Sequence, residues 1–204
     1  MLKKISKVIA DYYDAKVEQF GASPAGVDWN SIDSQLLRFE QLTKIFQEDK
    51  CFSITDLGCG YGALLDFLST NFTDFNYHGI DLSEKMIKLA RSRFKQATFE
   101  CGGRISEKAD YVIASGIFNV RQEVKSEEWS AYILETLEHM NAMCHKGLAF
   151  NCLTSYSDSE RTKDYLHYSD PASLFDYCKM HFSRNVALLH DYTLYEFTIL
   201  VRKS

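Results

Sequence analysis

The stretch ITDLGCGYGALLDFL, residues 54–68, limits the possible folds of this chain more than any other segment. A short apolar run ends at Asp56, glycines follow at alternate positions, and apolar residues then recur at helical spacing. The glycines are Gly58, Gly60 and Gly62, with Cys59 between the first two. Glycine adopts positive φ angles and lets backbone amides approach a ligand that a Cβ atom would block. The stretch predicts a strand, a ligand-holding turn and a helix; a tight turn without a ligand is the alternative.

Short apolar runs alternate with helical patterns over the rest of the chain. We expect strands at 52–57, 76–81, 97–103, 109–117 and 148–155, and helices at 63–71, 83–94, 126–145 and 172–182. Lys146 and Gly147 are expected to close the helix at 126–145. This order predicts a mostly parallel sheet with helices on both faces. Two final strands within 184–203 are joined by too short a turn for a parallel crossover, so they pair antiparallel or lie apart.

The first fifty residues show helical patterns only. Helices are expected at about 2–19 and 31–47, joined by the glycine- and proline-containing loop GASPAGVDWN. The chain has 204 residues, of which 46% are hydrophobic, and it contains no repeat or proline-rich linker. These features predict one domain over residues 1–204, with its core at 50–204.

Composition argues against several classes of function. The net charge of -5 and the pI near 5.7 do not suit a nucleic-acid-binding surface. Lys7 and Asp11 interrupt the N-terminal apolar run too early for a signal peptide or a membrane span. The six cysteines lie far apart, with no C-x-x-C pair and no cluster of zinc spacing, so we expect buried, reduced thiols and no metal site. A reducing, cytoplasmic setting follows.

Two carboxylates indicate which ligand the glycine turn holds. Gly58, Gly60 and Ala63 fit the dinucleotide pattern G-x-G-x-x-A, so a nicotinamide or flavin dinucleotide is one alternative. A carboxylate at the strand end would repel a pyrophosphate, so Asp56 favours a cationic or hydrogen-bond-donating group such as an α-amino group. Asp81 ends the next strand, where it accepts hydrogen bonds from two ribose hydroxyls or caps the following helix.

Four segments carry a resemblance to a known family. DLGCGYG, GIDLSEKMIKLAR, ADYVIASGIFN and HDYTLYEFTILVRK together resemble a class I S-adenosylmethionine-dependent methyltransferase over about residues 50–204. The resemblance implies a doubly wound, mostly parallel seven-stranded Rossmann-like sheet with one antiparallel strand near the C-terminus. It implies S-adenosylmethionine as cofactor and S-adenosylhomocysteine as product. Leu82 and Met86 would then sandwich the adenine or pack in the core.

One part of the family pattern is absent. Such enzymes often carry an aspartate after the third strand, near the adenine amino group, whereas this chain reads FECGGR. Either Glu100 or the backbone around Gly102 and Gly103 would replace it.

The methyl acceptor is less well defined. The segment ASGIFN lacks the Asn/Asp-Pro-Pro-Tyr/Phe signature of many enzymes that methylate amino groups of nucleic acids and proteins, so we expect a small-molecule or carrier-bound acceptor, with no nucleic-acid or membrane partner. Functional groups belong at the carboxyl ends of parallel strands. Ser115 is expected there as a cofactor contact, and His190 as a catalytic base or a structural residue. Tyr156 or Tyr195 would orient the acceptor.

In this family, segments that precede the core often close over the cofactor, so residues 1–47 are expected to form a helical lid. Tyr12, Tyr13 and Trp29 would give an aromatic wall for a sulfonium, or pack the helices on the sheet. Arg38 would pair with the methionyl carboxylate, or lie on a solvated helix face. Two other functions stay open: a dinucleotide-dependent oxidoreductase, and a non-catalytic S-adenosylmethionine-binding protein.

Overall fold

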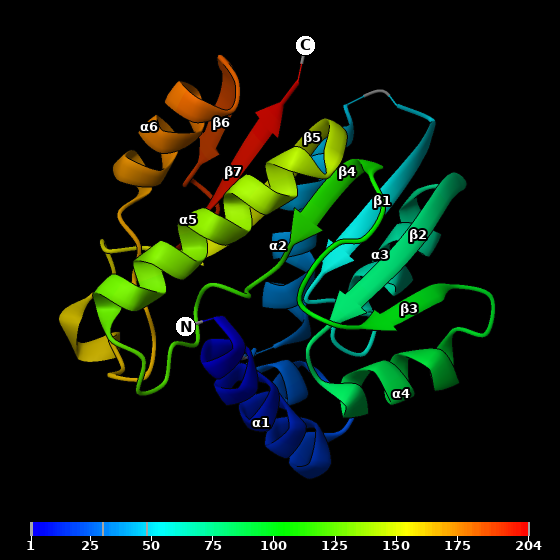
Figure 1. Ribbon diagram of the computed structural model, residues 1–204, viewed down its shortest axis with the longest axis horizontal. Coiled ribbons are helices and arrows are strands. Elements are labelled where there is room, and N and C mark those ends of the chain that lie inside the picture. The colour runs from blue at the N-terminus through cyan, green and yellow to red at the C-terminus, as the bar shows by residue number, and fades with distance from the viewer. Residues whose placement is uncertain (1, 30, 48, 204) are drawn as a thin grey trace.

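A seven-stranded sheet with the order β3-β2-β1-β4-β5-β7-β6 forms the centre of the protein (Figure 1). The computed structural model describes residues 2–29, 31–47 and 49–203. The strands are β1 (Cys51–Leu57), β2 (Asp74–Asp81), β3 (Thr98–Cys101), β4 (Ala109–Ala114), β5 (Cys144–Leu153), β6 (Asn185–Leu189) and β7 (Glu196–Arg202). All neighbours pair in parallel except β7, which is antiparallel to both β5 and β6. The predicted mixed sheet with one antiparallel strand is thereby confirmed.

Helices cover both faces of this sheet. They are α1 (Leu2–Phe20), α2 (Ile32–Thr43), α3 (Ala63–Asn71), α4 (Glu84–Arg93), α5 (Ser126–Ala142) and α6 (Pro171–His181), with short 3-10 turns at Pro24–Val27, Lys44–Phe46 and Ser159–Arg161. One core layer joins α1, α5 and α6 to the sheet, and the other joins α2, α3 and α4 to its opposite face. Among the residues described, no helix is long and apolar enough to span a bilayer.

Local sequence signals account for several of the element boundaries. The Ser83 hydroxyl accepts a hydrogen bond from the Met86 amide and caps α4, as predicted. Asp170 caps α6 in the same way, with Pro171 in its first turn. The register between β1 and β2 aligns Asp56 with Gly79, so both strands end at the same edge of the sheet.

The predicted end of the helix at 126–145 is wrong. Helix α5 ends at Ala142, and β5 already begins at Cys144, which pairs with Ala109 of β4. Gly147 lies within β5, where a Cβ atom would overlap the Val201 carbonyl oxygen of β7. Pairing with two neighbouring strands therefore outweighs the local helix-ending signal.

Two of the cysteines also differ from expectation: Cys51 and Cys101 are exposed.

The first helix lies at the carboxyl-end edge of the sheet, beyond the arrowheads of β1, β2 and β4 (Figure 1). Ile5, Ile9, Tyr13 and Val17 recur every four residues and therefore share one face of α1. Ile5 and Ile9 are buried in the core layer that includes α5, and Val17 packs with Met86 of α4. The amphipathic pattern thus lays α1 across the edge where the strands end.

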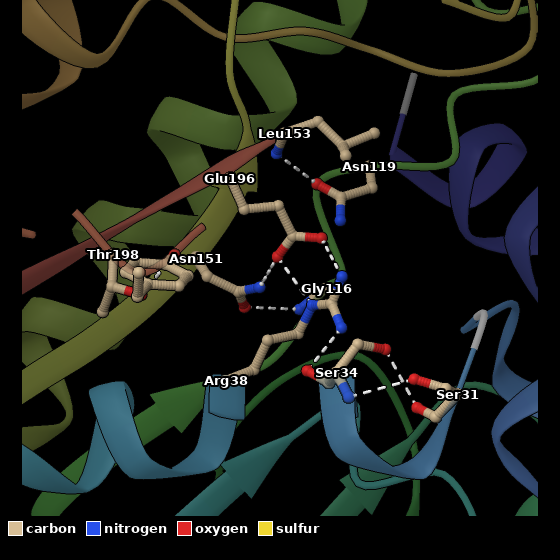
Figure 2. Close-up of polar contacts among 10 residues, drawn as sticks. Ser31, Ser34, Arg38, Gly116, Asn119, Asn151, Leu153, Glu196 and Thr198 are labelled. Atoms are coloured by element: carbon tan, nitrogen blue, oxygen red, sulfur yellow. Dashed lines mark hydrogen bonds and ion pairs between the residues drawn. The ribbon is translucent and has the colours of Figure 1, made fainter. Parts of the chain in front are cut away.

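A buried ion pair joins α2 to the sheet (Figure 2). Arg38 donates from Nε to Glu196 Oε2 at 2.8 Å and from Nη2 to Oε1 at 2.5 Å. Asn151 of β5 donates its amide Nδ2 to Glu196 Oε2 at 2.5 Å and accepts from the Gly116 amide at 2.9 Å. Arg38 also donates to the Ser34 carbonyl oxygen at 2.6 Å. Hydrogen bonds therefore connect α2, β7, β5 and the residues after β4.

Glu196 and Arg38 have relative exposures of only 1% and 6%. Each charge would be costly at that depth without its partner, whereas the bidentate geometry and the Asn151 amide satisfy the carboxylate. Removing one partner leaves the other charged and buried.

We expect Glu196→Ala to lower the free energy of unfolding by about 3 to 5 kcal/mol, because it leaves Arg38 buried without a counter-ion. Chemical denaturation followed by circular dichroism measures this change. A double variant, Arg38→Met with Glu196→Leu, should regain most of the loss, since neither charge remains. The exposed pair Lys7–Asp11 provides a control, and Lys7→Ala should leave stability unchanged within error. A Glu196→Ala variant as stable as the parent would contradict a structural role for the pair.

Candidate active site

The turn between β1 and α3 has the conformation that its glycines predict. Gly58, Gly60 and Gly62 have φ angles of 81°, 53° and 84°. The Gly58 amide donates to the Ile80 carbonyl oxygen at 2.7 Å, which ties the turn to β2. A Cβ atom on Gly58 would overlap the side chain of Ile117, from the loop after β4. The turn is therefore both left-handed and closely packed, and larger residues would not fit.

A cavity, here called the turn cavity, opens between this turn and the N-terminal helices. It encloses about 910 Å³ of space, counted out to its mouth. Ten of the residues predicted from the sequence line it: Tyr13, Trp29, Asp56, Gly58, Cys59, Gly60, Asp81, Leu82, Met86 and Ser115. The predicted Gly62, Arg38, Tyr156, Tyr195 and His190 lie outside its lining. Gly62 instead begins α3, where Phe94 and Phe99 pack against it.

Asp56 and Asp81 give the turn cavity its electrostatic character. Burial raises the pKa of Asp56 to about 7, opposed by the hydrogen bond that Tyr77 donates at 2.7 Å and reinforced by the charge of Asp81. Burial likewise raises the pKa of Asp81 to about 6, although the amides of Ser83 and Gly60 each donate to it at 2.8 Å. Two carboxylates held in a poorly solvated site favour a ligand that carries a cation and hydroxyl groups.

The remaining lining of the turn cavity includes residues that the sequence did not single out: Ile9, Val27, Gln35, Tyr132 and Thr136. Ile9 lies one helical turn before Tyr13, and Tyr132 lies one turn before Thr136, so spacing gives a local signal for each pair. Gly102 and Gly103 line the cavity as well. Glu100 lies outside it, and its carboxylate is 3.6 Å from the Nε2 atom of His78.

A second cavity, here called the rim cavity, adjoins the first. It is lined by residues of α1, α2, β5 and β7 and of the segments that follow α1, β4, β5 and β6, and it encloses about 1090 Å³ counted out to its mouth. Tyr13, Val27, Trp29 and Gly116 line both cavities. The two cavities therefore adjoin at these four residues.

Trp29 is the centre of the shared wall. Its indole packs against Gly116, whose φ of 76° and lack of a Cβ atom make room for the ring. The Arg38 guanidinium lies 3.9 Å from the ring centroid on Trp29. Tyr12, expected in the same aromatic wall, instead donates its hydroxyl to Asp28 at 2.8 Å. Arg38 is already bound by Glu196, so a ligand carboxylate would have to compete with that pair.

The residues predicted for acceptor chemistry lie at the half of the sheet that contains β5, β7 and β6. Tyr195 lines the rim cavity and donates its hydroxyl to Asp158. Tyr156 is 70% exposed, and its ring centroid lies 5.9 Å from that of His190. Strands β5 and β7 separate β4 from β6, so His190, which follows β6, lies about 14 Å along the sheet from β4 at ~4.8 Å per strand. A catalytic role for His190 stays a prediction.

Comparison with known proteins gives independent information. A family model described as a methyltransferase domain matches residues 55–147, which run from β1 to β5 and include the glycine turn. A protein of Mycobacterium tuberculosis (strain ATCC 25618 / H37Rv), named "Putative methyltransferase Rv1506c", is 55% identical over 156 residues, which is 75% of this chain and 94% of that protein.

Solved structures share the fold. Magnesium protoporphyrin IX methyltransferase from Synechocystis PCC 6803 with bound S-adenosylmethionine has a TM-score of 0.67 and 15% identity, covering 98% of this chain and 97% of its own. The plantazolicin methyltransferase BpumL, in complex with a pentazolic desmethylPZN analog and S-adenosylhomocysteine, has a TM-score of 0.63 and 15% identity over the full length of both chains. With the close relative and the matching family model, the glycine turn and its two carboxylates establish that the chain belongs to the class I S-adenosylmethionine-dependent methyltransferases.

Proposed function

We propose that the protein binds S-adenosylmethionine in the turn cavity and transfers its methyl group to a small molecule in the rim cavity. The observation that carries this proposal is the shared wall of Tyr13, Val27, Trp29 and Gly116. Methyl transfer requires direct contact between the two ligands, so the proposal requires the two adjoining cavities to open into one another beside these residues. The family excludes the dinucleotide-dependent oxidoreductase that the glycine pattern left open.

The residues of the turn cavity fit the cofactor. The positive φ angles of Gly58 and Gly60 bring the backbone close to the ligand without a Cβ atom. Asp81 would accept from the ribose hydroxyls and Asp56 would face the α-amino group. The Ser115 hydroxyl is buried without a hydrogen-bond partner among the residues described, so it is available to a ligand.

When bound, the cofactor supplies an electrophilic methyl group, and the electrons of its broken carbon–sulfur bond remain on sulfur. The chain must hold the acceptor in line and keep water away. Tyr13 and Trp29 present aromatic faces that suit a sulfonium cation and exclude water from the shared wall. A hydroxyl acceptor would also need a base for its proton, whereas a neutral amine attacks through its lone pair.

The N-terminal helices belong to this arrangement. We treat residues 1–204 as one domain, in which residues 1–47 form a lid over a core at 50–204. In support, α1, the loop after it and α2 contribute Tyr13, Trp29 and Gln35 to the wall of the turn cavity. The lid is thus part of the site, and cofactor binding depends on its position.

S-adenosylmethionine and S-adenosylhomocysteine should bind with low micromolar dissociation constants, or about -7 to -8 kcal/mol, and raise the melting temperature. NADH should do neither, since Asp56 repels a pyrophosphate. Isothermal titration calorimetry with all three ligands measures this. A protein that binds NADH and neither of the other two would refute the proposed function.

Asp81→Ala should weaken cofactor binding by about 1.5 to 3 kcal/mol, because two ribose hydroxyls lose a charged acceptor. Calorimetry measures the affinity, and a thermal melt shows whether the variant is folded. Asp74→Ala is a matched control, because Asp74 is exposed at the opposite end of the same strand. If Asp81→Ala lowers stability but leaves affinity unchanged, Asp81 acts only on the turn and the helix cap.

Affinity for S-adenosylmethionine should rise about tenfold between pH 5.5 and 7.5, because the α-ammonium group binds ionised Asp56, whose pKa without ligand is about 7. The folding stability of the protein without ligand changes with pH in the opposite direction. Neutral Asp56 contributes stability that is complete below pH 3.8 and is lost as the pH rises through about 7.

Asp56→Asn should bind more weakly at pH 7.5 and lose most of this dependence. The remainder would come from Asp81, whose pKa is about 6. Calorimetry across the pH range compares the Asp56→Asn variant with the parent. Affinity that stays level or falls as the pH rises would show that Asp56 does not bind the ammonium group.

A further inference from the structure

Asn119, which lines the rim cavity, has a buried hydrogen-bond donor that no other described residue uses. The residue is only 4% exposed. Its Oδ1 atom accepts from the Leu153 amide at 3.0 Å, which fixes the orientation of the side chain. Its Nδ2 atom has no partner among the residues described and is turned away from Leu153 (Figure 2). A buried donor without a partner is costly, so it marks a place for a ligand oxygen.

The charges around the rim cavity do not cancel. Arg38 and Glu196 neutralise each other. Asp28 is neutralised by Lys16, whose ammonium lies 2.7 Å from its carboxylate. Lys163 has no carboxylate within ion-pair distance in the described part of the chain. Arg161 meets Asp158 only at 4.0 Å, with both side chains largely exposed. Of the five charged side chains that the described residues contribute to the lining, three are cationic and two are anionic, so Arg161 and Lys163 give the lining itself an excess of one positive charge. Asp158, Glu160 and Asp164 of the same loop are exposed and lie outside the lining.

The loop that carries these two cations is anchored. Arg121, from the loop after β4, donates to the carbonyl oxygens of Asp164 and Leu166 at 2.5 and 3.2 Å. The Arg121 amide donates in turn to the Tyr165 carbonyl oxygen at 3.0 Å. The backbone that positions Lys163 is thus held against the strand end that forms the shared wall. A preorganised loop loses less entropy when a ligand binds.

We propose that the rim cavity takes a small acid: a molecule with a carboxylate or phosphate group at one end and a hydrogen-bond-accepting oxygen at the other. Arg161 and Lys163 hold the anionic group at the mouth, and Asn119 Nδ2 donates to the oxygen at the inner end. The methyl-accepting atom then lies beside Trp29 and Gly116. This inference rests on the proposed function, because it names the class of acceptor for that site.

The test begins with the protein saturated with S-adenosylhomocysteine, so that cofactor binding is established first. Calorimetry then measures the binding of 4-hydroxybenzoate, 4-aminobenzoate, 3-hydroxypropanoate and phenyl phosphate. The uncharged partner of each carboxylic acid is its amide, and the uncharged partner of phenyl phosphate is phenol. At least one acid should bind ten times more tightly than its uncharged partner, and this preference should shrink at high salt. The phosphate and carboxylate members distinguish the two anionic groups.

Substitutions show which residues of the rim cavity bind the acid. Arg161→Gln with Lys163→Gln should lower the affinity for the acid about tenfold and leave that for the uncharged partner unchanged. Asn119→Asp keeps the acceptor for Leu153 but removes the donor, so it should weaken both ligands. Lys95→Gln, an exposed lysine after α4, should change nothing. A thermal melt confirms that each variant is folded.

Different results refute the proposed function and the acidic acceptor. If S-adenosylhomocysteine does not bind, the proposed function is refuted. Three results would refute the acidic acceptor although S-adenosylhomocysteine binds: no acid binds, acids and uncharged partners bind equally, or the double variant keeps the preference for the acid. The methyltransferase assignment stands in each of these cases.

Discussion

The carboxylate of Glu196 lies almost completely inside the protein, and much of the site depends on how that charge is neutralised. Arg38 supplies the counter-ion from α2, and Asn151 supplies a further donor from β5. Because Asn151 also binds the Gly116 amide, one set of hydrogen bonds fixes the helix, the antiparallel strand and the loop after β4. The guanidinium that completes the pair also packs on Trp29. The wall between the two cavities is therefore held by the same charge.

This arrangement separates two tasks that a methyltransferase must perform. The turn cavity presents backbone amides and two carboxylates at adjacent strand ends, which are features of the parallel sheet itself. The rim cavity is built from α1, α2 and two long loops, which differ in length and sequence far more freely than the sheet. The two cavities nevertheless share Tyr13, Val27, Trp29 and Gly116, so a change in α1 or in the loop after it would affect both cavities.

Much of the fold and of the turn cavity could be predicted, because the signals are local. Alternate glycines after Asp56 permit the positive φ angles that other residues rarely adopt, and Ser83 and Asp170 are N-caps through contacts within three residues. The predicted end of the helix that became α5 was wrong because it depends on a distant contact. Gly147 is typical of a helix end, but pairing with β7, far away in sequence, extends β5 across it. Strand pairing over long sequence separations leaves no local pattern to read.

The sequence alone predicted the strand ends that carry Asp56, Gly58, Gly60 and Asp81, because these follow from residue type and short-range spacing. It predicted the family and the mixed sheet through the resemblance of four segments to known methyltransferases. Only the tertiary structure decided which distant residues meet. It paired Arg38 with Glu196, 158 positions along the chain, and left the Nδ2 atom of Asn119 without a partner in the rim cavity. It also placed β6, and with it His190, two strands beyond β5. The order of strands in a sheet and the partners of buried charges are set by packing of the whole chain, which no single segment encodes.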